Sequence, residues 1–205
     1  MAVKKIFLSP SEQFANAYAS GGTNEGAQMG MLAELVEERL KTRGFLVKTL
    51  HRETMAYKVA TADSWGADLY ICLHSNAYDR KTGGTRIFYW SKSSAGYKAG
   101  LKIFDRLAPL TPGTSDAMKQ DQSLYEIRNP EAPVVYVEVE FHDVAAYAKW
   151  IIEHLPEIAD AIVRGICDYY GVTYSSKYSV CLGHYSTRAE AENALKNISI
   201  KEMEE

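Results

Sequence analysis

The chain has 205 residues, enough for one α/β domain and at most a small appendage. Hydrophobic residues make up 46% of it and charged residues 24%, which is close to the globular average and excludes collagen-like, coiled-coil and wholly disordered chains. The formal net charge is −3 and no basic cluster is longer than Lys4-Lys5, so the sequence excludes the electrostatic signature of a nucleic-acid-binding protein.

The three cysteines, Cys72, Cys167 and Cys181, are odd in number and lack the C-x-x-C spacing of a zinc knot. We expect them to be small core residues of a protein made in a reducing compartment. The apolar run Ile6–Leu8 is far shorter than the core of a signal peptide, and no run approaches a membrane span. The sequence therefore predicts synthesis in the cytoplasm without a signal peptide, and no membrane partner.

The first elements are a strand, a long loop and a helix. Residues 3–8 form a short apolar run that ends before Pro10, as expected of a buried strand. Residues 9–23 are rich in Ser, Ala, Asn and Gly and predict a long loop, which in a compact domain is more often functional than idle. A helix is expected from a cap at Thr23-Asn24 to Gly44, because apolar residues recur at i, i+4 between these two signals.

The alternation of strand and helix continues to residue 171. The run at 84–90 is rich in aromatic and apolar residues and predicts a strand. The β-branched run at 133–139 predicts a second, buried strand, and proline is tolerated there because it stands at the first position. Residues 111–130 are predicted to be mostly loop. The other expected elements are strands at 45–50 and 68–73 and helices at 55–65, 94–107, 144–154 and 156–170.

This order of elements predicts an α/β fold. We expect a mostly parallel, mixed and twisted sheet with helices on both faces, and a ligand site outside the carboxyl ends of the strands. The domain is expected to span residues 1–172, followed by a polar linker at 173–177. Residues 178–205 repeat the strand and helix pattern on a scale too small to bury a core, so they predict a docking tail or part of a further module.

Polar side chains gather where the predicted strands end. The loop after the first strand offers Glu12 and Gln13, the first helix begins with Glu25, the third strand runs into His74, and the last strand carries Glu138. In a parallel sheet these positions lie at one edge, so they can meet. Histidine and carboxylates with no cysteine nearby are typical ligands of a catalytic zinc site, which keeps a position open for water.

Glu138 is the strongest single candidate. Its neighbours Val135, Val137 and Val139 predict burial, and a buried carboxylate without a partner is costly, so a paired or functional role is expected. A carboxylate that is not a ligand can act as general base and then proton donor beside an activated water. Glu140 is an equal candidate to point the same way, because residues two apart on a strand share a face.

The same residues also have purely structural interpretations. His74 alone fits a hydrogen-bonded structural histidine, and Glu25 alone fits a first-turn residue that stabilises the helix dipole. Arg128 lies in a predicted loop and is either a contact for a substrate carboxylate or a solvated charge.

The ordered motifs resemble the zinc-dependent N-acetylmuramoyl-L-alanine amidases, the cell-wall hydrolases found as phage endolysins and bacterial autolysins. The resemblance covers about residues 3–171 and rests on four segments: IFLSPSEQ (6–13), TNEGAQM (23–29), ICLHSNA (71–77) and PVVYVEVEF (133–141). It implies hydrolysis of the amide between N-acetylmuramic acid and the L-alanine of the stem peptide, with peptidoglycan as the partner and Zn²⁺ as the cofactor.

Carried over to this chain, the resemblance implies that Glu25 and His74 are metal ligands and that Glu138 is the catalytic residue. The family's first ligand is a histidine after the first strand, and this loop has none. Alignment of the motif favours Gln13 there, whereas ligand chemistry favours Glu12, because an amide oxygen is a poor zinc ligand. Either choice predicts altered zinc affinity. The candidate substrate-binding residues are Asn76, Glu140 and Arg128.

The tail YSVCLGHYSTRAEAENALKNI looks like the opening of a SPOR-type peptidoglycan-binding repeat, which suggests wall targeting or a homodimer formed through the tail. Together with the lack of a signal peptide, the resemblance favours a phage or prophage endolysin that acts at the cell wall.

Two other functions stay open at this point. The chain could be a catalytically impaired amidase-like module that binds peptidoglycan, because the first histidine ligand is missing. It could also be a zinc carboxypeptidase-like enzyme that cleaves another amide.

Overall fold

A computed structural model of the chain describes residues 3–174. The predicted tail at 178–205, with Cys181 in it, and most of the predicted linker lie outside the described residues. The other two cysteines, Cys72 and Cys167, are buried free thiols, as expected of core residues. No helix among residues 3–174 has the length and apolar character needed to cross a membrane.

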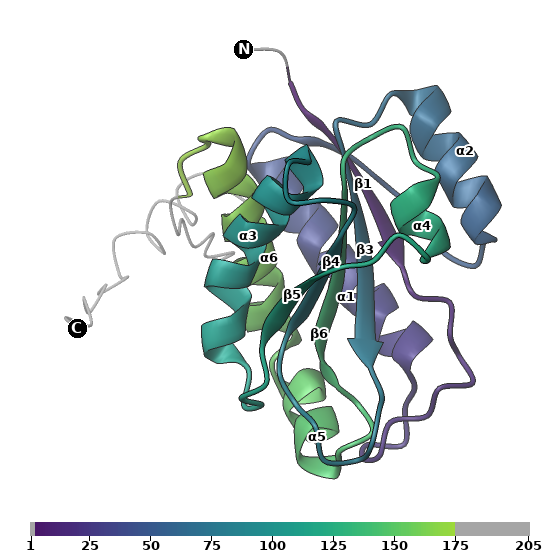
Figure 1. The fold of residues 1–205 in the computed structure, drawn as a ribbon, viewed down its shortest axis with the longest axis vertical. Helices are drawn as coiled ribbons and strands as arrows, with labels where there is room; N and C mark the ends of the chain where they lie inside the picture. The colour runs from purple at the N-terminus through teal and green to yellow at the C-terminus, as the bar shows by residue number, and fades with distance from the viewer. Residues whose placement is uncertain (1–2, 175–205) are drawn as a thin grey trace, which may run out of the picture. The chain divides into compact units, whose positions relative to one another are not determined.

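Six strands form one twisted sheet at the centre of the fold (Figure 1). The strand order is β2-β1-β3-β6-β4-β5, and the first four strands in this order pair in parallel. Strand β4 runs antiparallel to β6 and parallel to β5. The strands are β1 (Lys5–Pro10), β2 (Leu46–Thr49), β3 (Leu69–Asn76), β4 (Arg86–Tyr89), β5 (Ala117–Gln120) and β6 (Val134–Phe141).

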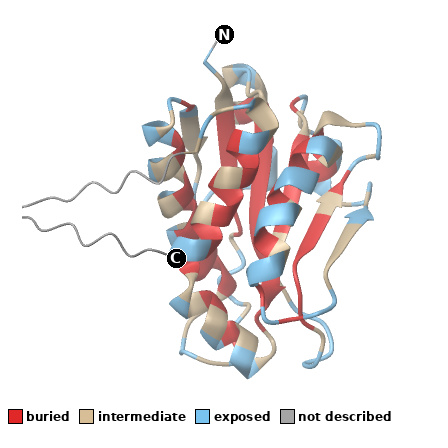
Figure 2. Cartoon of the chain, turned by 90° about the vertical axis from the view of Figure 1, so that its left-hand side faces the viewer, coloured by how far each residue is buried: buried red, intermediate tan, exposed pale blue. Residues whose placement is uncertain are grey.

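Helices cover both faces of the sheet, which confirms the predicted α/β class. Helices α1, α3 and α6 pack on one face, where the main hydrophobic core lies, and α2 and α4 pack on the other (Figure 1). Figure 2 shows central strands buried behind helices whose outward residues are exposed, whereas the edge strands β2 and β5 are only partly buried. The helices are α1 (Glu25–Thr42), α2 (Met55–Trp65), α3 (Ala95–Leu107), α4 (Tyr125–Arg128), α5 (Ala145–Glu153) and α6 (Leu155–Tyr170), with a 3-10 turn at Ala108–Leu110.

Alternation along the central strands separates the two cores. On β3, Leu69 and Ile71 belong to the core under α1, α3 and α6, whereas Tyr70 and Cys72 belong to the core under α2 and α4. The same alternation turns His74 toward the α2 and α4 side, at the carboxyl end of the strand. The sheet therefore places the polar ends of β1 and β3 on the face that carries fewer helices.

The region predicted as loop at 111–130 differs from the expectation. It holds the edge strand β5 and the short helix α4. The β5 sequence AMKQ has little intrinsic strand preference, and the strand forms because the free edge of β4 offers its backbone groups for pairing.

The direction of β4 also follows from the chain between the strands. No helix separates β3 from β4, so the chain leaves the carboxyl edge of the sheet and returns in the opposite direction. A parallel neighbour would have needed a helical crossover.

Candidate active site

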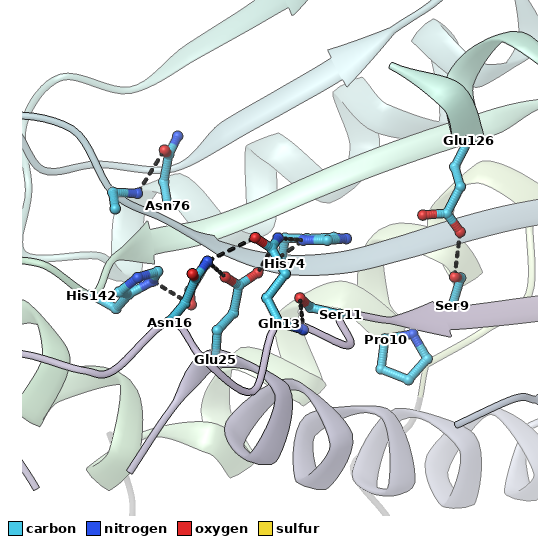
Figure 3. Close-up of polar contacts among 12 residues, drawn as sticks. Ser9, Pro10, Ser11, Gln13, Asn16, Glu25, His74, Asn76, Glu126 and His142 are labelled. Carbon is cyan, nitrogen blue, oxygen red and sulfur yellow. Dashed lines mark hydrogen bonds and ion pairs between the residues drawn. The ribbon is translucent and has the colours of Figure 1, made fainter. Parts of the chain in front are cut away.

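Four polar side chains meet at the carboxyl ends of β1 and β3 (Figure 3). The loop after β1 supplies Gln13 and Asn16, the first residue of α1 is Glu25, and β3 supplies His74. The Nδ1 atom of His74 lies 2.9 Å from Oε1 of Glu25, and the Nε2 atom of Gln13 lies 3.4 Å from both of these atoms. Three of the sequence-predicted residues, Gln13, Glu25 and His74, are thus brought into direct contact.

The loop that delivers Gln13 is fixed to the start of α1. Asn24 caps the helix by accepting from the backbone N–H of Ala27, and the backbone N–H of Glu25 donates to the carbonyl of Asn16. Glu25 is buried at 1% exposure, in the first turn, where the helix dipole favours a carboxylate.

Glu25 is held in its charged form. Burial alone would raise its pKa, but hydrogen bonds from His74 and Asn16 and the attraction to the imidazole outweigh this effect, so the pKa of Glu25 lies below its ordinary value. The ring of Tyr136 stacks on the His74 ring at a centroid distance of 4.4 Å. The imidazole is therefore oriented by a carboxylate at one edge and an aromatic ring on one face.

Glu138 lies beside this cluster on β6. It pairs in register with His74, and Tyr136, two residues earlier, shares its face of the strand. The Glu138 side chain is partly exposed, yet its Oε2 atom is enclosed and has no hydrogen-bond partner among the described residues. Burial, with repulsion from Glu25 as a second cause, raises the pKa of Glu138 well above its ordinary value. This carboxyl therefore holds a proton more strongly than an exposed glutamate.

The two candidates for the first ligand lie in different places. The carboxylate of Glu12 bonds to the buried Lys58 ammonium at 2.9 Å and to the backbone N–H of Arg52, away from Glu25 and His74. Gln13 occupies the position next to the Glu25 and His74 pair. Lys58 also donates to the Pro10 carbonyl, so Glu12 neutralises a structural lysine.

Glu140, two residues after Glu138 on β6, makes a different set of contacts. The register between β3 and β6 shifts after His74, so that Asn76 pairs with Phe141, and Glu140 lies within this irregularity. Its carboxylate is fully buried and accepts from the backbone N–H groups of Gly84, Gly113 and Phe141. The Glu140 carboxylate therefore anchors the loops that contain Gly84 and Gly113.

The two remaining candidates also lie away from the cluster. Asn76 accepts a hydrogen bond from the neighbouring Ala77 N–H, and Figure 3 shows its side chain apart from the Glu25 and His74 pair. Arg128 is the exposed last residue of α4. Substrate contact through either residue stays a prediction.

The sequence analysis missed Asn16 and Tyr136. The Nδ2 atom of Asn16 donates both to Oε1 of Gln13, at 2.7 Å, and to Oε2 of Glu25, at 2.9 Å. The only feature of the sequence that indicated a role for Asn16 was its place in the long loop after the first strand. Tyr136 resembled an ordinary core residue of β6, and only the strand register shows that its ring covers His74.

Of the three side chains that could bind a zinc ion here, two are of a kind that zinc prefers. An imidazole nitrogen and a carboxylate oxygen are ordinary zinc ligands, and those of His74 and Glu25 are already side by side. Among residues 3–174 no group of three His, Cys, Asp or Glu side chains is placed to hold a metal. The third ligand would be the carbonyl of Gln13, which here accepts from Asn16. The residues fit a zinc ion through two ligands of the usual kind and one neutral amide.

A family comparison decides what kind of protein this is. Residues 12–168 match the profile described as N-acetylmuramoyl-L-alanine amidase. The chain belongs to this family. Peptidoglycan hydrolysis is the activity that this membership gives it, and the family is generally zinc-dependent. A search of curated protein sequences found no significant match.

Solved structures of amidases share the fold of this family member. The amidase AmiC2 of Nostoc punctiforme superposes with a TM-score of 0.73 at 17% identity, covering 82% of this chain and 97% of that one. The catalytic domain of CwlV from Bacillus (Paenibacillus) polymyxa var. colistinus gives 0.73 at 18% identity, covering 83% and 100%. The catalytic domain of the CD27L endolysin, which targets Clostridia difficile, gives 0.69 at 23% identity, covering 80% and 97%.

Proposed function

We propose that this amidase-family chain cleaves the amide between N-acetylmuramic acid and L-alanine with one Zn²⁺ ion held by Glu25 and His74, and with Gln13 as the third protein ligand. The observation that carries the proposal is the contact between Glu25 and His74 next to a carboxyl, Glu138, whose Oε2 atom has no partner among the described residues. When bound, zinc supplies Lewis-acid chemistry: it lowers the pKa of water and polarises a carbonyl.

Glu138 is the proton carrier of this proposal. It accepts the proton of the attacking water and delivers it to the amide nitrogen, which departs as the amine of L-alanine. A carboxyl with an ordinary pKa would give up this proton to solvent at neutral pH, whereas burial raises the pKa of Glu138 and makes it a useful donor.

His74 and Glu25 act through their fixed orientation. Tyr136 stacks on the imidazole, and Asn16 donates to the carboxylate of Glu25, so both ligands keep their geometry without the ion. In metal sites generally, contacts of this kind hold in place the side chains that bind the metal directly. We propose that they compensate in part for the weak donor at Gln13.

Purified peptidoglycan digested by the protein tests the reaction. We expect stem peptides to be released with L-alanine as the new amino terminus, zinc to be present at about one ion per chain, and a chelator to stop release. A different new amino terminus would indicate hydrolysis of another amide. Peptidoglycan binding with neither zinc nor peptide release would instead identify a catalytically impaired binding module. We also propose that the chain is a phage or prophage endolysin, and we then expect the protein, added with a membrane-permeabilising agent, to lyse intact bacteria.

A further inference from the structure

A cleft of about 610 Å³ opens from the catalytic cluster along the α2 and α4 face of the sheet. His74, Gln13 and Tyr136 form one end of it, and the start of α2 and the buried carboxylate of Glu126 form other parts of its wall. No step of the proposed mechanism uses Glu126. It lines the same cleft as His74, so a substrate that fills the cleft can contact it.

Glu126 is held rigidly by two hydroxyl groups. The Ser9 Oγ atom donates to its Oε1 atom at 2.5 Å, and the Tyr70 hydroxyl donates to the same oxygen at 2.6 Å (Figure 3 shows the Ser9 contact). All three side chains are buried, with Glu126 at 4% exposure. Within residues 3–174 no hydrogen bond engages the other oxygen, Oε2. This oxygen is not one of the enclosed atoms that lack a partner, so it is open to the cleft and can accept a hydrogen bond from a ligand there.

The charges that face the cleft favour a cationic ligand. Lys58 is already paired with Glu12 and bonded to the Pro10 carbonyl, so these two charges cancel each other. The other acidic groups on the wall are the carboxyls of Glu53 and Glu126. A bare metal ion is a poor match for Glu126, since one of its oxygens already serves two hydroxyl donors and no group of three ligating side chains lies within the described residues.

We propose that Glu126 binds a protonated primary amine on the stem peptide, and so selects substrates whose peptide carries such an amine. The inference rests on the proposed function, because it takes the cleft as the path of the stem peptide. An ammonium group in the cleft can donate an N–H to Oε2, and a charge-assisted hydrogen bond of this kind is stronger than a neutral one. Glu126 is therefore assigned to specificity and not to the chemical step.

A binding experiment tests this assignment without requiring turnover. Two synthetic stem peptides capped at the amino terminus are titrated into the full chain by calorimetry, one with a free side-chain amine and one with that amine acetylated. We expect the free amine to bind about tenfold more tightly. The variant Glu126→Gln is expected to lose this preference, whereas the matched control Glu53→Gln, on the same cleft wall, is expected to keep it.

Equal affinity of the wild-type chain for the two peptides would overturn the proposal, as would a full preference retained in Glu126→Gln. If circular dichroism shows that Glu126→Gln does not fold, Glu126→Asp replaces it, and the preference is then expected to shrink because the shorter carboxylate withdraws from the cleft. A chain that shows the preference and releases no stem peptide from peptidoglycan would refute the proposed function and keep the amine site.

Discussion

The surroundings of Glu138 and of Glu140 on β6 differ although the two residues are neighbours on one strand. Burial raises the pKa of both carboxyls, so the direction of the shift does not separate them. Hydrogen bonding does. Glu140 accepts from three backbone N–H groups, whereas Oε2 of Glu138 has no partner among the described residues. A satisfied buried carboxylate stabilises the fold, and an unsatisfied one is available for chemistry.

The largest expected effect is on catalysis and comes from Glu138→Gln. This change keeps the shape of the side chain and removes its ability to accept and return a proton, so we expect kcat/KM for peptide release to fall by about 10²- to 10⁴-fold. Zinc content should not change, because Glu138 is not assigned as a ligand. Activity within tenfold of the wild type would show that the proton is carried by another group.

The same substitution at the second carboxyl, Glu140→Gln, is expected to change stability. An amide NH₂ placed against backbone N–H donors loses an acceptor in a buried site, so we expect a loss of about 1–3 kcal/mol in the free energy of unfolding, measured by urea denaturation. The exposed Glu131→Gln serves as the control and should be neutral. If the folded fraction of Glu140→Gln lost activity as Glu138→Gln does, the division between the two residues would be wrong.

The next largest effect is on metal affinity and comes from Gln13→His. An imidazole at this position replaces a neutral amide with an ordinary zinc ligand, so we expect zinc to bind at least about tenfold more tightly in competition with a coloured chelator. Glu12→Gln is the control, because Glu12 pairs with Lys58 and should not alter zinc binding. The opposite pattern, with affinity lost in Glu12→Gln and unchanged in Gln13→His, would return the ligand role to Glu12.

The smallest effect is a dependence of stability on pH, measured with chelator present. The pKa of Glu138 is raised in the folded chain, so as the pH rises above the ordinary glutamate value of 4.5 the unfolded chain releases this proton first and the folded state loses stability. Glu138→Gln lacks this titration. Its melting temperature should therefore exceed that of the wild type at neutral pH, and the difference should shrink as the pH falls toward 4.5. A difference that does not change with pH would indicate that Glu138 does not titrate in this range.

Local sequence patterns predicted several helices and strands well and failed for one strand. The helix predicted at 55–65 matches α2, and the capping signal at Thr23-Asn24 leads to a helix capped by Asn24. The strands β3 and β6 each run to a few residues beyond their predicted ends, because their pairing with each other continues past the apolar run. The strand β5 could not be predicted from AMKQ, since its partner β4 lies about 30 residues earlier in the chain.

The sequence by itself determined the α/β class, the motifs of the amidase family and the set of residues from which the site is built, because hydrophobic periodicity, capping and residue chemistry are local properties. Only the tertiary structure decided which of these residues meet. The loop after β1 brings Gln13, and not Glu12, to Glu25 and His74, and Glu140 accepts from backbone N–H groups while Oε2 of Glu138 has no partner among the described residues. Such choices depend on strand register and on contacts between distant segments, and neither is encoded in the spacing of residues along the chain.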